Sequence, residues 1–379
     1  MTAKAQGNGT GSSVTLRAVG DVALIAHAAD ALLSGRNKDW ERTAALLSSA
    51  DVTFTNFEMA LPRGDLERIA PDVSPDLVGV ADALASFLTA GIDVVALATN
   101  HIMDWGTEGL SDTLAQFREH GVATVGAGMN VEESARPAII ERGGLKIGFA
   151  AFTPEQRWTA GPDRPGAAPL TFESVERALA GMAGADVRII SLHWGLEMSG
   201  YPTPEDRELA RRIAEAGADL IIGHHPHVIQ GVERFGRTPV VYSMGNFIFD
   251  INAGRVEHGF DPEDLRSAYM VEAELTSDGV ADLRTVPVWL DDDGIGHTAS
   301  GERADRIAAR VRTCSDDIEA GSSAVWESAG GTLVRHKLKC MRQSLKDGGI
   351  GFVLGELKRV RLRHFKLLCG YVAGRLKRS

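Results

Sequence analysis

Three histidines stand within four positions of this chain, in the sequence Gly223-His224-His225-Pro226-His227. They follow an apolar run, Ala218 to Ile222, that is typical of a buried strand. Residues two apart in an extended segment point the same way, so His225 and His227 can face one point in space. Histidine is the commonest metal ligand among side chains. The segment therefore predicts a metal site at a strand end, and the alternative is a surface loop that happens to be rich in histidine.

Other residues that could bind metals or protons also come directly after apolar, strand-like runs. They are Asp21, Asn56, Glu58, Asn100, His101, Asp104, His193, Glu197 and Asn246. In open α/β sheets, ligands bind outside the carboxyl ends of the strands. Taken singly, Asp21 could cap a helix, Asn100 could sit in a turn and His193 could be a satisfied core histidine. Taken together, the residues predict one composite site.

The donors in this set are nitrogen and oxygen atoms, without thiolates. Such a set suits one or two divalent ions of Mn, Zn, Fe or Mg rather than a structural, cysteine-rich zinc site. A carboxylate such as Glu58 could bridge two cations, and a water between them would become a nucleophile. His101 and Asp104 are three positions apart, so they can pair as a general acid/base couple. The alternative for Asp104 is a cap for a helix that begins near Gly106.

The elements that must position these residues alternate between strands and helices. We predict strands at Val14–Val19, Val52–Thr55, Ile92–Ala98, Leu145–Phe152, Asp186–Leu192 and Asp219–Ile222, and helices at Asp76–Ala90, Thr107–Glu119 and Glu205–Ala216. Three further strand-like runs, Thr238–Tyr242, Tyr269–Leu275 and Leu283–Trp289, are less separated by helices. This alternation indicates an α/β fold with parallel pairing and both sheet faces covered. We expect a disordered lead-in over residues 1–13, a main domain over 14–293 and a helical, basic extension over 294–379.

Composition favours a globular protein of the cytoplasm. The chain has 379 residues, of which 44% are hydrophobic, and it lacks an apolar run long enough to span a membrane. The first residues have no apolar core of the kind found in secretory signals. The three cysteines, Cys314, Cys340 and Cys369, are far apart and odd in number, which indicates a reducing compartment.

The net charge of −11 is unevenly distributed along the chain. Residues 333–379 carry 13 Lys and Arg against two Asp and Glu, a local charge of +11, and the rest of the chain carries −22. Basic amphipathic helices of this kind can lie on an anionic membrane surface, here the inner face of the membrane. The alternative is a pair of solvated helices packed on the main domain. We expect no nucleic-acid partner, because the acidic body would repel a duplex.

Six short sequence blocks between about Val14 and Asp250 resemble those of a known family in order, spacing and residue identity. The blocks are Gly20-Asp21, Asn56-Phe57-Glu58, Ala98 to Gly106, His193 to Glu197, Gly223 to Gly231 and Tyr242 to Asp250. They are similar to those of the CapA proteins, the poly-γ-glutamate capsule biosynthesis branch of the calcineurin-like metallophosphoesterases.

The resemblance implies a four-layer α/β/β/α metallophosphoesterase-like sandwich with a metal site at the strand ends. It implies that Asp21, Glu58, Asn100, His193, His225 and His227 are metal ligands and that His101 protonates a leaving group. It leaves Asn56, Glu197, His224 and Asn246 as residues that contact the substrate or support the ligands. The chain departs from the general phosphoesterase pattern, which opens Asp-x-His, because Asp21 is followed by Val22-Ala23 and one expected ligand is missing.

Two functions follow as expectations. The first is a metal-dependent hydrolase that acts on a phosphoester or on an anionic, γ-glutamyl-type polymer. The second is a non-catalytic accessory protein that binds an anionic polymer or a membrane synthase partner. The intact His101–Asp104 pair favours the first.

Overall fold

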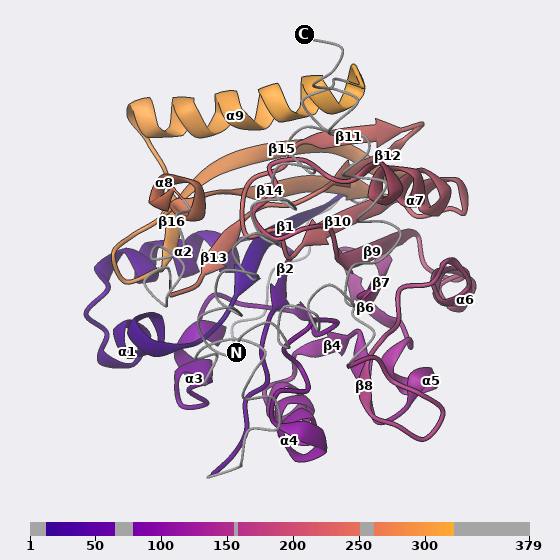
Figure 1. Cartoon of the computed structure of the whole chain (residues 1–379), viewed down its shortest axis with the longest axis horizontal. Helices are drawn as coiled ribbons and strands as arrows, with labels where there is room; N and C mark the ends of the chain where they lie inside the picture. The colour runs from indigo at the N-terminus through magenta and orange to yellow at the C-terminus, as the bar shows by residue number, and fades with distance from the viewer. Residues whose placement is uncertain (1–12, 65–78, 155–157, 251–260, 322–379) are drawn as a thin grey trace, which may run out of the picture.

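The computed structural model describes residues 13–64, 79–154, 158–250 and 261–321. Two sheets pack face to face in this part of the chain (Figure 1). The first sheet has the spatial order β16 (Gly296–Thr298), β15 (Gly279–Leu290), β14 (Ser267–Thr276), β1 (Val14–Val22), β2 (Val52–Phe57), β3 (Val94–Ala96) and β4 (Ala123–Val125), with β13 (Asn246–Ile248) also paired to β1. The second has the order β11 (Val232–Phe235), β12 (Thr238–Val241), β10 (Leu220–His224), β9 (Val187–His193), β7 (Leu145–Phe152) and β6 (Ala138–Arg142). A small ribbon pairs β5 (Ala127–Gly128) with β8 (Gly166–Ala167).

The strands next to the site are parallel within each sheet. In the first sheet, β1, β2, β3 and β4 pair in parallel, and β13 joins the carboxyl end of β1 in the same direction. In the second, β7, β9, β10 and β12 are parallel. Antiparallel pairs, among them β14 with β15 and β11 with β12, flank these parallel centres. The predicted α/β class is confirmed, and the carboxyl ends of many strands share one edge.

The described helices are α1 (Ala26–Ser34), α2 (Lys38–Ser48), α3 (Ala83–Leu88), α4 (Gly106–Glu119), α5 (Val131–Ser134), α6 (Phe172–Gly181), α7 (Pro204–Glu215), α8 (Pro262–Arg266) and α9 (Gly301–Glu319). The helices α1 to α4 cover the outer face of the first sheet, and α6 and α7 cover that of the second. Local chemistry fixes several of their starts. Asn37 and Thr171 cap α2 and α6, and α7 begins with a reciprocal Thr203–Asp206 capping box and a proline. None of the described helices combines the length and the apolar character that a membrane crossing needs.

Three apolar clusters separate four layers. One lies between the first sheet and α1 to α4 and contains Phe57 and Phe87. The second fills the space between the sheets, where Phe54 stacks on Phe149 at 5.6 Å between ring centroids. The third lies between the second sheet and α6 and α7, and includes Trp194. The layers therefore follow the order helix, sheet, sheet, helix, which is the four-layer sandwich that we expected.

Several predicted elements differ in length from the observed ones. The strand predicted at Ile92–Ala98 is only three residues long, because the chain leaves the sheet at Leu97 to reach Asn100. Of the helix predicted at Asp76–Ala90, the described part is helical only over Ala83–Leu88, and residues 76–78 lie outside the described residues. The helices α1 and α2 were not predicted.

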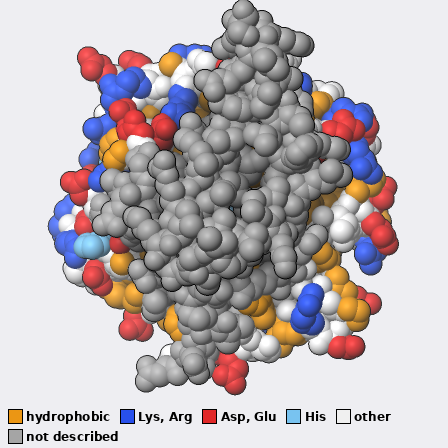
Figure 2. Space-filling model, viewed as in Figure 1, with side chains coloured by type: hydrophobic (Ala, Val, Ile, Leu, Met, Phe, Trp, Pro, Cys, Tyr) orange, Lys and Arg blue, Asp and Glu red, His pale blue; other side chains and the backbone are white. Residues whose placement is uncertain are grey.

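The segment after the predicted boundary at residue 293 begins within the sandwich. β16 pairs with β15, and Ile307 and Val311 of α9 pack into the cluster between the sheets. Figure 1 shows α9 running beside β15 and β11. Residues 1–12 of the lead-in that we expected to be disordered, and the basic segment 333–379, lie outside the described residues. The domain division and the membrane contact therefore stay predictions. Where described side chains are visible in Figure 2, Lys and Arg are interspersed with Asp and Glu.

Candidate metal centre

The six side chains expected to bind metal lie together where the carboxyl ends of the two sheets meet. The first sheet contributes Asp21 from the end of β1, Glu58 from just after β2 and Asn100 from the turn after β3. The second sheet contributes His193, the last residue of β9, and His225 and His227, which follow β10. Because each sheet supplies half of the set, the site depends on how the two sheets pack.

Two groups of three donors share one carboxylate. Glu58, His193 and His225 form one group and Asp21, Glu58 and His227 form the other, with the donor atoms of each group within 4.8 Å of one another. Glu58 Oε1 lies 3.6 Å from His193 Nε2 and 3.4 Å from His227 Nε2. Ligand atoms that surround one cation at about 2.0–2.2 Å are separated by roughly 3–4 Å. The spacing therefore fits two cations that share Glu58.

Asn100 extends the first group. Its Oδ1 atom lies at hydrogen-bond distance from His193 Nε2, at 2.8 Å, which places the Asn100 oxygen beside the first group. Asn100 lies in a turn, which was the alternative to a role in the site, and its side chain also reaches the centre. With Asn100 the first group has four donors, the number that zinc usually takes in proteins.

Asp21 is held in place by three donors. Its Oδ1 accepts a hydrogen bond from Asn56 Nδ2 at 2.9 Å and lies 3.1 Å from His224 Nδ1, and its Oδ2 accepts from the His225 backbone N–H at 3.1 Å. Burial alone would raise the pKa of Asp21, but the hydrogen bond from His224 and the charges of His224 and His227 hold that pKa below its usual value. Asp21 lies within β1 and does not cap a helix. His224 orients this ligand from a fully buried position.

The backbone around Pro226 is strained at both flanking histidines. His225 and His227 have φ of +95° and +60°, values that residues other than glycine rarely adopt. Such outliers cluster at functional sites, where the surrounding structure over-determines them. His227 Nδ1 lies 2.9 Å from Asn246 Oδ1, which accepts its proton and leaves Nε2 facing Glu58. Ligating histidines are commonly fixed in this way by a second hydrogen bond.

The buried histidines favour the neutral form that binds metals. Burial lowers the pKa of His193 well below its usual value, and the neighbouring histidines, His225 first, lower it further. Burial also lowers the pKa of His225, against the opposing charges of Glu197 and Glu58. Among the described residues, no hydrogen-bond partner is found for His225 Nδ1. A buried, unsatisfied ring nitrogen beside carboxylates fits a cation site.

His101 and Asp104 form a buried pair beside this centre. His101 Nδ1 lies 2.9 Å from Asp104 Oδ2, and both side chains are almost completely buried. The position before α4 is occupied by Trp105, whose side chain makes no capping hydrogen bond. Asp104 therefore orients His101 rather than capping the helix. His101 directly follows Asn100, so the pair adjoins the first group of donors.

Glu197 approaches the second group from the loop after β9. Its Oε1 atom lies 3.9 Å from His227 Nε2, and its side chain is 43% exposed. The ring of Phe249 packs on His227, with 5.0 Å between the centroids. The sequence did not predict the packing of Phe249 on His227 or the hydrogen bond from the His225 backbone N–H to Asp21, because neither has a signature in residue type or spacing.

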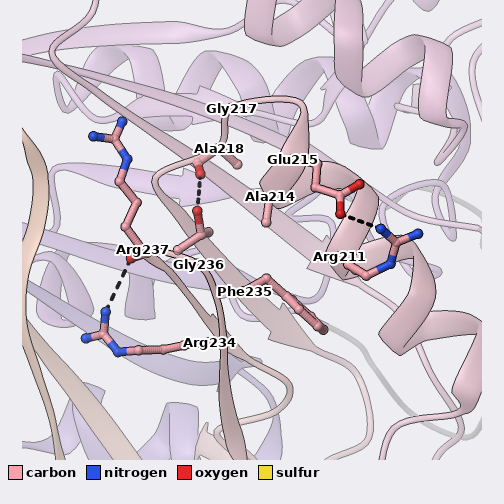
Figure 3. A pocket seen from close by; sticks show the side chains of 10 residues that line it. Arg211, Ala214, Glu215, Gly217, Ala218, Arg234, Phe235, Gly236 and Arg237 are labelled. Carbon is pink, nitrogen blue, oxygen red and sulfur yellow. Dashed lines mark hydrogen bonds and ion pairs between the residues drawn. The ribbon is translucent and has the colours of Figure 1, made fainter.

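A separate cavity of about 520 Å³ lies at the other edge of the second sheet (Figure 3). It is lined by the end of α7 and by the turn between β11 and β12. Arginines surround it, but Arg211 pairs with Glu215, Arg234 donates to the carbonyl of Arg237, and Arg237 pairs with Asp219. The cavity contains none of the residues of the metal centre.

Comparison with known sequences assigns the family. A profile described as "Bacterial capsule synthesis protein PGA_cap" matches residues 15–251, which is more than half of the chain and includes every residue of the candidate centre. The chain belongs to this family. The PGA_cap match thus confirms the expected resemblance to the CapA proteins.

Three named relatives are each 28% identical to the chain over the residues that align. A "PGA biosynthesis protein CapA" of Bacillus subtilis is 28% identical over 244 residues, which cover 63% of this chain and 60% of that protein. A "Capsule biosynthesis protein CapA" of Bacillus anthracis is 28% identical over 286 residues, covering 73% and 67%. A "probable polyglutamine synthesis accessory protein" of Mycobacterium tuberculosis is 28% identical over 270 residues, covering 66% and 69%. The chain thus spans about 60% of the length of the Bacillus subtilis protein.

A solved structure described as a novel phosphatase from Mycoplasma pneumoniae overlaps the chain with a TM-score of 0.47 at 14% identity. The overlap covers 75% of this chain and 96% of the other. This overlap does not assign an activity to the chain.

Proposed function

We propose that this PGA_cap protein is a metal-dependent hydrolase in capsule or poly-γ-glutamate synthesis. Its substrate would be a phosphoester or an anionic, γ-glutamyl-type polymer. The observation that carries the proposal is the pair of donor groups that share Glu58, with the buried His101–Asp104 couple beside them.

The donor chemistry fits divalent cations. Glu58, His193, His225 and Asn100 would hold one ion, and Asp21, Glu58 and His227 would hold the other. When bound, such ions act as Lewis acids and lower the pKa of a coordinated water. Nitrogen and oxygen donors suit Zn, Mn or Fe, with Mg the less nitrogen-tolerant choice.

His101 would supply the proton that the leaving group needs. Because Nδ1 faces Asp104, the other ring nitrogen, Nε2, is the one available for proton transfer. The Asp104 carboxylate stabilises the protonated ring and fixes its orientation. In hydrolysis, a water oxygen bonds to the reacting centre and releases one proton to solvent, the bond to the leaving group breaks, and the proton on His101 Nε2 goes to the departing atom. A proton from solvent then restores His101.

The charges of the centre favour an anionic substrate only when cations are bound. Asp21, Glu58 and Glu197 bring three carboxylates to one site, and these would repel a phosphate or a polyglutamate chain. Divalent cations reverse this repulsion. A cation-free hydrolase of the same substrates is therefore disfavoured.

The test compares the wild type with an Asp21→Ala, His225→Ala double variant. Both proteins are purified without chelator, analysed for metal content, and assayed with a phosphodiester, a phosphomonoester and poly-γ-glutamate. Stoichiometric metal and turnover in the wild type, both lost in the variant, support the proposal. Absence of transition metal from the wild type, together with no turnover after Mn or Zn is added, would overturn it.

A second candidate is the accessory protein that binds polymer or a synthase partner without catalysis. It is favoured by the Val22-Ala23 departure in the first block and by the description of the Mycobacterium tuberculosis relative. Stoichiometric metal without turnover of any of the three substrates, combined with binding of poly-γ-glutamate, would favour this candidate over the hydrolase.

A further inference from the structure

The two donor groups differ in the number of protein donors that they contain. The first becomes a four-donor set when Asn100 is included. The second, formed by Asp21, Glu58 and His227, has three donors. Zinc takes at least four ligands and manganese takes more, so the second cation needs another protein group or additional water.

Glu197 is a further carboxylate beside the second group. Its Oε1 atom lies 3.9 Å from His227 Nε2, while Glu58 Oε1 lies 3.4 Å from the same nitrogen. Both distances fall in the roughly 3–4 Å range expected between ligand atoms of one cation. The other nitrogen of the His227 ring, Nδ1, lies 2.9 Å from Asn246 Oδ1 and 3.4 Å from Asp21 Oδ2, and Nε2 is the atom that faces both glutamates.

The loop that carries Glu197 is tied to the loop that carries the histidines. The backbone N–H of Trp194 donates to the His224 carbonyl at 3.1 Å, and that of Met198 donates to the Pro226 carbonyl at 2.8 Å. These two bonds lie on either side of Glu197 in the sequence. Glu197 is therefore placed against His227 by backbone contacts and not by its side chain alone.

A strained turn directs the Glu197 side chain. Ser199 N–H donates to the Leu196 carbonyl at 3.1 Å, which closes a four-residue turn with Glu197 and Met198 at its centre. Met198 has φ of +59°, a conformation that turns usually assign to glycine. Strain of this kind persists where the surrounding structure imposes it.

From these contacts we infer that Glu197 is a direct ligand of the cation held by Asp21, Glu58 and His227. This inference rests on the proposed metal centre and adds a fourth protein donor to its second group. The ligand would be a carboxylate oxygen from a side chain that is 43% exposed, whereas Asp21, Glu58 and His227 are buried.

The test measures metal binding rather than turnover. Chelator-treated wild type, Glu197→Gln and Glu197→Asp are titrated with Mn²⁺ by calorimetry, and the Co²⁺ forms are compared by their visible absorption spectra. Glu176→Gln is the matched control, because Glu176 is an exposed glutamate on α6, outside the metal centre. Far-UV circular dichroism checks that each variant is folded.

We expect two Mn²⁺ sites in the wild type and in Glu176→Gln. In Glu197→Gln, one site should weaken by at least about 10-fold while the other is unchanged, because even supporting residues of metal sites cost 10–100-fold when lost. The Mn²⁺ affinity of that site in Glu197→Asp should lie between those of the wild type and Glu197→Gln. The Co²⁺ spectrum should change in Glu197→Gln and stay unchanged in Glu176→Gln.

The possible outcomes distinguish the role of Glu197 from the existence of the metal centre. Two sites of wild-type affinity in Glu197→Gln, with an unchanged Co²⁺ spectrum, would overturn the role of Glu197 and leave the proposed metal centre intact. A wild type that binds neither Mn²⁺ nor Co²⁺ would overturn both.

Discussion

At the scale of single residues, the His101–Asp104 pair decides between a catalyst and a binding protein. Both side chains are buried and joined at 2.9 Å, yet neither belongs to the two donor groups. His101→Asn should therefore keep the metal content of the wild type but lower kcat by about 10²–10⁴-fold, the usual range for a lost general acid. Steady-state kinetics on whichever substrate is hydrolysed, with metal analysis of the same samples, checks this. An unchanged kcat would remove His101 from the mechanism.

Tyr242 permits a pH prediction that does not involve the metal centre. Its hydroxyl donates to Glu233 at 2.8 Å, and burial, with the charge of Glu233, raises its pKa far above the usual 10.0. The folded state thus keeps this proton when the unfolded chain loses it. The stability that Tyr242 provides is complete below about pH 10 and is lost as pH rises further, by up to about 1.4 kcal/mol per pH unit.

The comparison that isolates this effect is wild type against Tyr242→Phe, unfolded with urea between about pH 8 and pH 11. The advantage of the wild type in unfolding free energy should shrink above about pH 10, since phenylalanine cannot ionise. A difference that stays constant over the whole range would mean that the tyrosine ionises equally in both states.

At the scale of elements, the pairing of β1 with β13 positions Asp21. The two strands approach so closely at Gly20 that an added Cβ would lie 2.0 Å from the Gly245 carbonyl oxygen. Gly20→Ala should therefore separate the strands, cost about 1–3 kcal/mol of unfolding free energy and weaken metal binding. Gly184→Ala is the control, because an added Cβ there meets no atom within 4 Å. Urea unfolding and Mn²⁺ titration report the two effects, and equal values for both variants would contradict the argument.

The sequence was most informative where strands end. The runs before Asp21, Glu58, His193 and His225 are apolar and short, so the strands and the polar residues after them could be predicted. The allocation of those strands to two sheets could not, because pairing depends on contacts between residues far apart in the chain. The same limit hid the contact of His224 with Asp21, which joins residues 203 positions apart. Asp104 stayed open between a helix cap and a partner of His101 for a different reason, because both interactions would join residues only a few positions apart.

At the scale of the whole molecule, the candidate centre is built from residues of both sheets. Asp21, Glu58 and Asn100 come from the first sheet, and His193, His225 and His227 come from the second. A cation bound by Glu58 and His193 would link the sheets at their carboxyl edge, in addition to the apolar cluster between them. Metal binding should therefore stabilise the entire sandwich and not only the loops that carry the ligands.

This linkage predicts how stability responds to metal removal. A ligand that binds only the folded state at 100 times its dissociation constant adds about 2.7 kcal/mol to the unfolding free energy. Mn²⁺ added to chelator-treated wild type should therefore raise the unfolding midpoint in urea, and EDTA should reverse the shift. The Asp21→Ala, His225→Ala variant removes one donor from each group and should show no shift. Because the cation joins both sheets, hydrogen exchange should slow in β2 and in β9 together. Protection confined to the loops after β9 and β10 would show that the metal stabilises one sheet edge without joining the two.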